Sequence, residues 1–73
     1  MKLPVVSAEQ AISAFRKLGY VPDRQKGSHI ILRQPAPPYR RLVIPRHPEV
    51  AKGTLRTLIR EAGLTVEEFC ALL

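Results

Sequence analysis

Apolar residues recur at helical spacing in the first part of the chain. Four of them share one stripe: Ala11, Ile12, Phe15 and Leu18. This spacing predicts a helix that starts after Ser7 and ends at Gly19, because glycine adopts the left-handed conformation that closes helices. Ser7 is a favourable N-cap, and Gln10 stands at the position that completes a capping box.

An alternating pattern then predicts two strands joined by a turn. Residues 20–25 form the first extended segment, Lys26-Gly27 form the turn, and residues 28–33 form the second strand. Alternation divides the second strand into two faces: Ser28, Ile30 and Leu32 on one, His29, Ile31 and Arg33 on the other. Because Ile30 and Leu32 are the apolar half, we expect them to face the helices.

A third strand is predicted after a proline-rich loop. Residues 34–39 cannot continue a strand, because their prolines donate no hydrogen bond to a sheet. Residues 40–44 resume the alternation and are closed by Pro45, with Leu42 and Ile44 expected inward. Arg41 is then expected on the same open face as His29 and Arg33.

The last part of the chain predicts two more helices. One begins near Gly53-Thr54, ends at Gly63 and carries an apolar stripe of Leu55, Leu58, Ile59 and Ala62. Thr65 to Glu68 form a capping box for a short third helix. The order α-β-β-β-α, with a short extra C-terminal helix, predicts a two-layer α+β domain with a three-stranded antiparallel sheet and helices on one face.

Length and composition limit the function. The 73 residues fit one domain, 1–73, with a small core and a shallow surface site. No apolar run approaches the roughly 20 residues that span a bilayer, and the start is too short and proline-broken for a secretory signal. We therefore expect a cytoplasmic protein without membrane contact. The single Cys70 is expected in the core, and two histidines 18 residues apart indicate no metal or cofactor site.

The positive charge is concentrated in the middle of the chain. The formal net charge is +6, and residues 24–60 contain nine basic side chains with Glu49 as the only acid. Such a segment suits nucleic acid or an acidic protein partner. The alternative is a solvated face that keeps a small protein in solution. The excess of basic over acidic side chains in residues 24–60 favours nucleic acid or an acidic protein partner.

Three groups are candidates for chemistry or phosphate binding. His29 follows a glycine turn among cations, where an imidazole is suited to proton transfer, although an ordinary polar residue on an exposed strand explains it too. His47 is in a loop and has prolines near it, so it is a weaker candidate for a catalytic group than His29. The third group is at a predicted helix start, where the amides of Gly53 and Thr54 form either an anion site or a plain helix start. Arg56 and Arg60, four residues apart, would extend such a site along the helix.

Four segments resemble the HicA (YcfA-like) toxins of type II toxin–antitoxin systems. They are Arg24-Gln25-Lys26-Gly27-Ser28-His29, Pro45-Arg46-His47-Pro48, Gly53-Thr54-Leu55-Arg56 and Ala62-Gly63-Leu64. The resemblance implies a double-stranded-RNA-binding-domain-like fold, ribosome-independent mRNA cleavage and neutralisation by a HicB-type antitoxin. The family's catalytic histidine follows Gly-Ser, which corresponds to His29. His47 corresponds to its second, proline-flanked histidine.

The leading hypothesis is therefore a metal-independent mRNA interferase in which His29 acts as general acid or base. The candidate RNA-binding residues are Arg24, Lys26, Ser28, Arg33, Arg41 and Arg56. Water, substrate, Ser28 or a lysine is the second proton-transfer partner, and the free protein is expected to be a monomer or weak dimer. The alternatives are a non-catalytic RNA-binding module of the same fold and, ranked last, a DNA-binding helix-turn-helix that uses residues 66–72.

Overall fold

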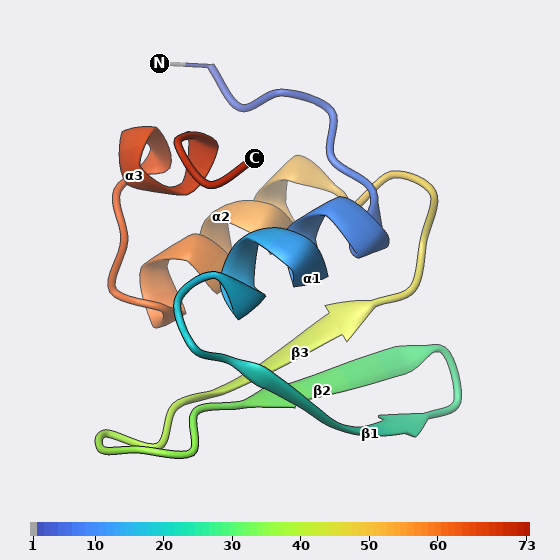
Figure 1. Ribbon diagram of the computed structural model, residues 1–73. Coiled ribbons are helices and arrows are strands. Elements are labelled where there is room, and N and C mark those ends of the chain that lie inside the picture. Colours follow the sequence, from blue (N-terminus) through green and yellow to red (C-terminus); the bar gives the residue numbers. More distant parts are fainter. Residues whose placement is uncertain (1) are drawn as a thin grey trace.

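The computed structural model describes residues 2–73 and has the predicted order of elements (Figure 1). The helices and strands are α1 (Ala8–Arg16), β1 (Val21–Lys26), β2 (His29–Arg33), β3 (Arg41–Pro45), α2 (Lys52–Glu61) and α3 (Val66–Cys70). The α+β class and the α-β-β-β-α layout with a short extra helix are thus confirmed. Met1, the first residue of the predicted domain 1–73, lies outside the described residues.

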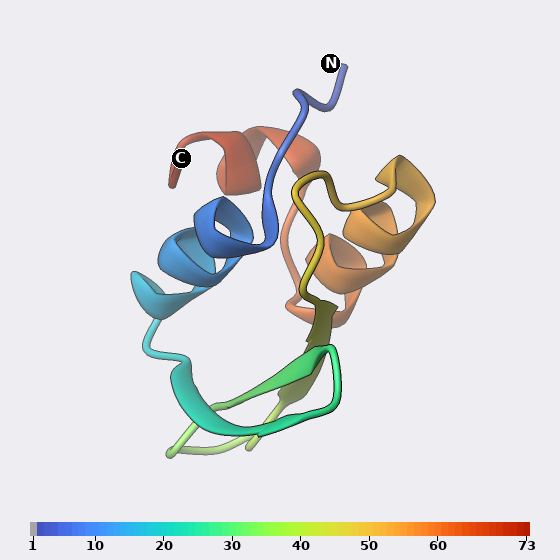
Figure 2. The ribbon, with the colours of Figure 1, turned by 90° about the vertical axis from the view of Figure 1, so that its right-hand side faces the viewer.

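Helices α1 and α2 form one layer and the sheet forms the other, and α3 lies on the side of these helices away from the sheet. The three strands are antiparallel in the order β1-β2-β3. Both α1 and α2 lie on one side of the sheet, as Figures 1 and 2 show from two directions. The opposite face of the sheet carries no element of the described chain, so it is open, as the strand pattern predicts.

Local side-chain capping marks where α1 and α3 begin. The Ser7 hydroxyl accepts a hydrogen bond from the Gln10 amide at 3.1 Å, and the Gln10 side chain accepts one from the Ser7 amide at 2.9 Å. The second predicted capping box, of Thr65 and Glu68, is formed in the same way at the start of α3. Two details were wrong. Helix α1 ends at Arg16, so Leu18 lies beyond the helix and is exposed. The turn consists of Gly27 and Ser28, so Lys26 belongs to β1 and Ser28 precedes β2.

The hydrophobic core joins both layers. It includes Phe15 of α1, Leu32 of β2, Leu42 and Ile44 of β3, and the predicted stripe of α2. Ile30 packs against it and is half-buried, so the predicted inward face of β2 is confirmed. Burial of a continuous apolar cluster is the main stabilising term for a domain of this size.

The third helix belongs to this core. Phe69 is fully buried, and its ring centroid lies 5.2 Å from that of Phe15. Cys70, expected in the core, is only half-buried. The side chains that α3 exposes include Glu67 and Glu68, which are unsuited to a DNA groove, so the helix-turn-helix alternative gains no support. None of the helices within residues 2–73 is long and apolar enough to cross a membrane.

Candidate functional site

The strand register shows which side chains share the open face. Residues opposite one another in antiparallel strands point to the same side of a sheet. Across the open face, His29 of β2 lies between Lys26 of β1 and Pro45 of β3. In the next row, Ile31 lies between Arg24 and Val43. In the third, Arg33 lies between Val21 and Arg41.

This arrangement brings together most of the residues expected to bind phosphate. Arg24, Lys26, Arg33 and Arg41 are all exposed on the open face, together with His29. Ile31 lies on this face as well, yet it is only 4% exposed although it lies outside the core cluster. The centre of the open face is therefore a covered apolar side chain, and the cations lie around it.

His29 stands at the first position of β2, directly after a tight turn. Gly27 in that turn has a φ of +60°, a conformation that glycine adopts without a steric penalty. The imidazole is exposed, and it takes part in none of the side-chain hydrogen bonds of residues 2–73. Lys26 is directly opposite, which places the two Cβ atoms about 4.5–5.5 Å apart.

One acidic residue reaches this face, and sequence reasoning missed it. The register between β1 and β2 shifts between Pro22 and Arg24, and Asp23 lies at this irregularity. Its carboxylate oxygen Oδ2 lies 3.0 Å from Nη2 of Arg33. Arg33 therefore keeps a bound counter-charge, while the charges of Arg24, Lys26 and Arg41 have no such partner within residues 2–73.

The remaining predicted site residues lie elsewhere. Gly53, Thr54 and Arg56 belong to α2, which covers the opposite face of the sheet from His29. The N-cap position of α2 is Ala51, and no side chain caps the helix. The structure therefore does not bring Arg56 to the open face.

His47 lies in the connector that follows β3. Its backbone amide donates to the Pro45 carbonyl at 2.9 Å, and its carbonyl accepts from the amide of Ala8 at 3.0 Å. The chain thus turns away from the open face after Pro45 and meets the start of α1. The backbone of His47 has a structural role at this helix end, whatever its exposed imidazole does.

Three cationic side chains contact other groups of the protein. Nη1 of Arg40 donates to the Ala62 carbonyl at 3.5 Å, at the C-terminal end of α2, where a positive charge is favourable. Nζ of Lys17 donates to the Leu72 carbonyl at 2.7 Å. Arg46 contacts α1 and β1, as described below. These contacts reduce the cations available to a ligand below the number in the sequence.

Arg40 also lies near the buried Tyr20. Burial raises the pKa of the Tyr20 phenol, and the positive charge of Arg40 opposes that rise. Within the described residues, the Tyr20 hydroxyl has no hydrogen-bond partner. Arg40 is thus held against the helical layer, which explains why it does not join Arg41 on the open face.

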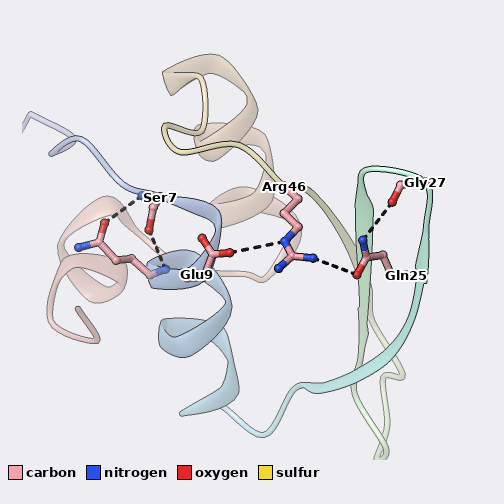
Figure 3. A network of polar contacts seen from close by, with 6 residues as sticks. Ser7, Glu9, Gln25, Gly27 and Arg46 are labelled. Carbon is pink, nitrogen blue, oxygen red and sulfur yellow. Dashed lines mark hydrogen bonds and ion pairs between the residues drawn. The ribbon is translucent and has the colours of Figure 1, made fainter.

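A polar network supports the turn before His29 (Figure 3). Nε2 of Gln25 donates to the Gly27 carbonyl at 3.1 Å, and Oε1 of Gln25 accepts from Nη1 of Arg46 at 3.4 Å. Nε of Arg46 lies 3.6 Å from a carboxylate oxygen of Glu9 on α1. The network connects the end of β1, the end of β3 and the first turn of α1.

The site is a surface and not a cavity. Two surface hollows lie on α1 and between α1 and the C-terminal segment, and neither is lined by His29. Residues 2–73 contain no group of three or more His, Cys, Asp or Glu side chains placed to hold a metal ion. The polar groups of the open face are one imidazole, several cations and the carboxylate of Asp23.

The fold and this face define a class of protein: a small α+β domain with two helices on one face of its sheet and a cationic surface bearing a histidine on the other. Residues 8–64 match the sequence profile of the HicA toxin of bacterial toxin-antitoxin systems, and since this match covers most of the chain, the protein belongs to the HicA toxin family. The resemblance found in the sequence is thereby confirmed, and an antitoxin is the partner that the family implies. No curated protein matches the chain.

Proposed function

We propose that this protein is an endoribonuclease that cleaves mRNA on the open sheet face, with His29 as general acid or base. The observation that carries the proposal is the exposed His29 directly opposite Lys26 on a face with further cations. Proton transfer by a positioned side chain and electrostatic stabilisation of developing charge are the two contributions that this chemistry needs.

The reaction uses the nucleophile that RNA itself carries. A base removes the proton of a ribose 2′-hydroxyl, the 2′-oxygen forms a bond to phosphorus, and the bond from phosphorus to the 5′-oxygen breaks. An acid gives a proton to that leaving oxygen. The products are a 2′,3′-cyclic phosphate and a 5′-hydroxyl. His29 performs one of the two proton transfers, and Lys26 is the nearest cross-strand cation that can stabilise the negative charge on the phosphorane.

The other cations hold neighbouring nucleotides. Arg33 and Arg41 lie opposite each other at the far end of β2 from His29. Four residues of strand correspond to about 13 Å along the backbone, so we place these arginines at phosphates that flank the one reacting at His29. They bind flanking phosphates and set the path of the RNA across the face. Such contacts position the chain without reading its bases.

The antitoxin of this toxin is of the HicB type and covers the same face. The cations that bind RNA also attract an acidic protein surface, and a partner seated over His29 excludes RNA from it. One surface then accounts both for activity and for its inhibition.

A cleavage assay tests the proposed function. Purified protein is incubated with a defined single-stranded RNA in the presence of EDTA, and the fragment ends are read by mass spectrometry. Cyclic-phosphate and 5′-hydroxyl ends are expected, while the same RNA with 2′-O-methyl groups should stay intact because it lacks the nucleophile. Ends with a 5′-phosphate, or cleavage that EDTA abolishes, would contradict the mechanism. Intact RNA bound by folded protein would favour the non-catalytic RNA-binding module.

Removing the carboxylate beside Arg33 should strengthen RNA binding. In Asp23→Asn, Arg33 loses its counter-charge at 3.0 Å and the open face gains one net positive charge. Affinity for uncleavable 2′-O-methyl RNA should rise because Arg33 no longer shares its charge with Asp23, and the slope of log K against log salt should steepen by up to about 0.7, the value for one full phosphate contact on a single strand. Glu67→Gln, which neutralises an exposed acid on α3, is the matched control. Equal effects of the two substitutions would contradict a role for Arg33 in RNA binding.

A further inference from the structure

We propose that Arg46 is a positioning residue: it holds Gln25 so that Gln25 fixes the turn preceding His29, and it is not one of the cations that bind RNA. The proposal rests on the proposed function of His29. It extends that function by assigning roles to Arg46, Gln25 and Glu9, none of which belongs to the open face.

Two consecutive carbonyls of the turn each accept a hydrogen bond. The Ser28 carbonyl accepts the backbone amide of Arg46 at 2.7 Å, and the Gly27 carbonyl accepts Nε2 of Gln25 at 3.1 Å. Gly27 has no side chain that restrains it. A hydrogen bond to the Gly27 carbonyl therefore restricts the backbone conformation of the turn, and with it the position of His29 two residues later.

The Arg46 side chain determines which way the Gln25 amide points. An amide group presents a donor at one end and an acceptor at the other, and a guanidinium has only donors. Because Nη1 of Arg46 takes the Oε1 end of Gln25 at 3.4 Å, the Nε2 end is left for the Gly27 carbonyl. Glu9 in turn lies 3.6 Å from Nε of Arg46, so α1 supports the turn through the side chains of Glu9, Arg46 and Gln25 (Figure 3).

The placement of Arg46 argues against a role in phosphate binding. Arg46 follows Pro45, the last residue of β3, and the His47 amide donates to the Pro45 carbonyl, so the chain turns away from the open face at Arg46. The Arg46 side chain accordingly contacts α1, where the Glu9 carboxylate repels a phosphate. Both members of this ion pair are more than half exposed, and such pairs add little to stability. Loss of the Arg46 side chain should therefore leave the fold intact.

The first test compares Arg46→Ala, Arg46→Lys and Gln25→Ala. Arg16→Ala is the control, because it removes an exposed cation of α1 that lies outside the polar network. At saturating RNA, Arg46→Ala and Gln25→Ala should each lower the single-turnover cleavage rate about 10- to 100-fold, the range expected when a reacting group is displaced. The double variant should be no slower than either single variant, because both residues act on one carbonyl. Lysine at position 46 should not restore the rate, since an ammonium lacks the guanidinium fork that holds Glu9 and Gln25 together.

The second test separates positioning from RNA binding. Binding of 2′-O-methyl RNA should show the same salt dependence for Arg46→Ala and Arg16→Ala. A slope lowered by about 0.7 in Arg46→Ala, with cleavage rescued by Arg46→Lys, is the signature of a phosphate contact and would overturn the proposal. Additive losses in the double variant would overturn it as well.

A third measurement is independent of cleavage. Nuclear magnetic resonance relaxation of the Ser28 and His29 amides should report greater mobility in Arg46→Ala than in Arg16→Ala. If the wild-type protein bound RNA but did not cleave it, the proposed function would fail, yet this comparison would still decide whether Arg46 orders the turn. Unchanged relaxation in Arg46→Ala would reject the positioning role.

Discussion

His29→Ala should abolish RNA cleavage and leave both the fold and RNA binding intact. General acid–base catalysis by one side chain contributes about 10²–10⁴-fold to a rate, so the single-turnover rate should fall by at least two orders of magnitude. The imidazole is exposed and makes none of the side-chain hydrogen bonds in the described part of the chain. Removal of the imidazole should therefore change the free energy of unfolding little. Circular dichroism and binding of 2′-O-methyl RNA check these two properties.

His47→Ala is the matched comparison, because it removes the other imidazole of the chain. The structural contacts of His47 are made by its backbone, which the substitution keeps. We expect its loss of activity to be much smaller than that of His29→Ala. Equal losses would mean that the two histidines share the proton transfers. An active His29→Ala protein would refute the assigned role of His29.

The fold was predictable because its signals are local. The capping residues Ser7 and Thr65 lie three residues from the side chains that complete their boxes. The alternation of Ile30 and Leu32 with His29 and Arg33 likewise needs only neighbouring residues to assign the inward face. The open face with His29, Arg33 and Arg41 followed from that alternation, and the register confirms that Arg33 and Arg41 are directly opposite each other.

The missed features depend on contacts between distant residues. Asp23 is six residues before His29 in the sequence, and only the strand irregularity and the pairing of β1 with β2 bring its carboxylate to Arg33. Arg46 contacts Gln25 and Glu9, which lie 21 and 37 positions before it in the sequence. A count of charges along the chain treats Arg33, Arg40 and Arg46 as equivalent. The structure separates them, because each has a different partner.

This separation changes how the net charge should be interpreted. Arg40 and Arg46 stabilise or position parts of the fold, whereas Arg24, Lys26 and Arg41 present charge to the solvent on one face. RNA affinity should therefore depend on a few cations at defined positions around His29. Their number is smaller than the nine basic side chains of residues 24–60 suggest.

Phe69→Ala should have the largest effect on stability. Phe69 is fully buried and packs against Phe15, and truncation of a buried phenylalanine costs about 3–5 kcal/mol. At about 0.05–0.15 kcal/mol per residue, a domain of this length has a free energy of unfolding of roughly 4–11 kcal/mol. The substitution therefore removes a large part of the total. Urea denaturation followed by far-ultraviolet circular dichroism measures the difference.

Leu73→Ala is the control, because it truncates an apolar side chain of the same C-terminal segment that is half-exposed. Its cost should stay within about 0.5 kcal/mol, as for ordinary surface substitutions. The comparison matters because the family match ends at residue 64, before α3 begins. A helix of five residues is not stable alone, so α3 depends on its packing against the core, where Phe69 is its buried side chain. If Phe69→Ala cost no more than Leu73→Ala, residues 8–64 would close the core without α3. A loss of several kcal/mol would show that α3 forms one cooperative unit with the fold that carries the open face.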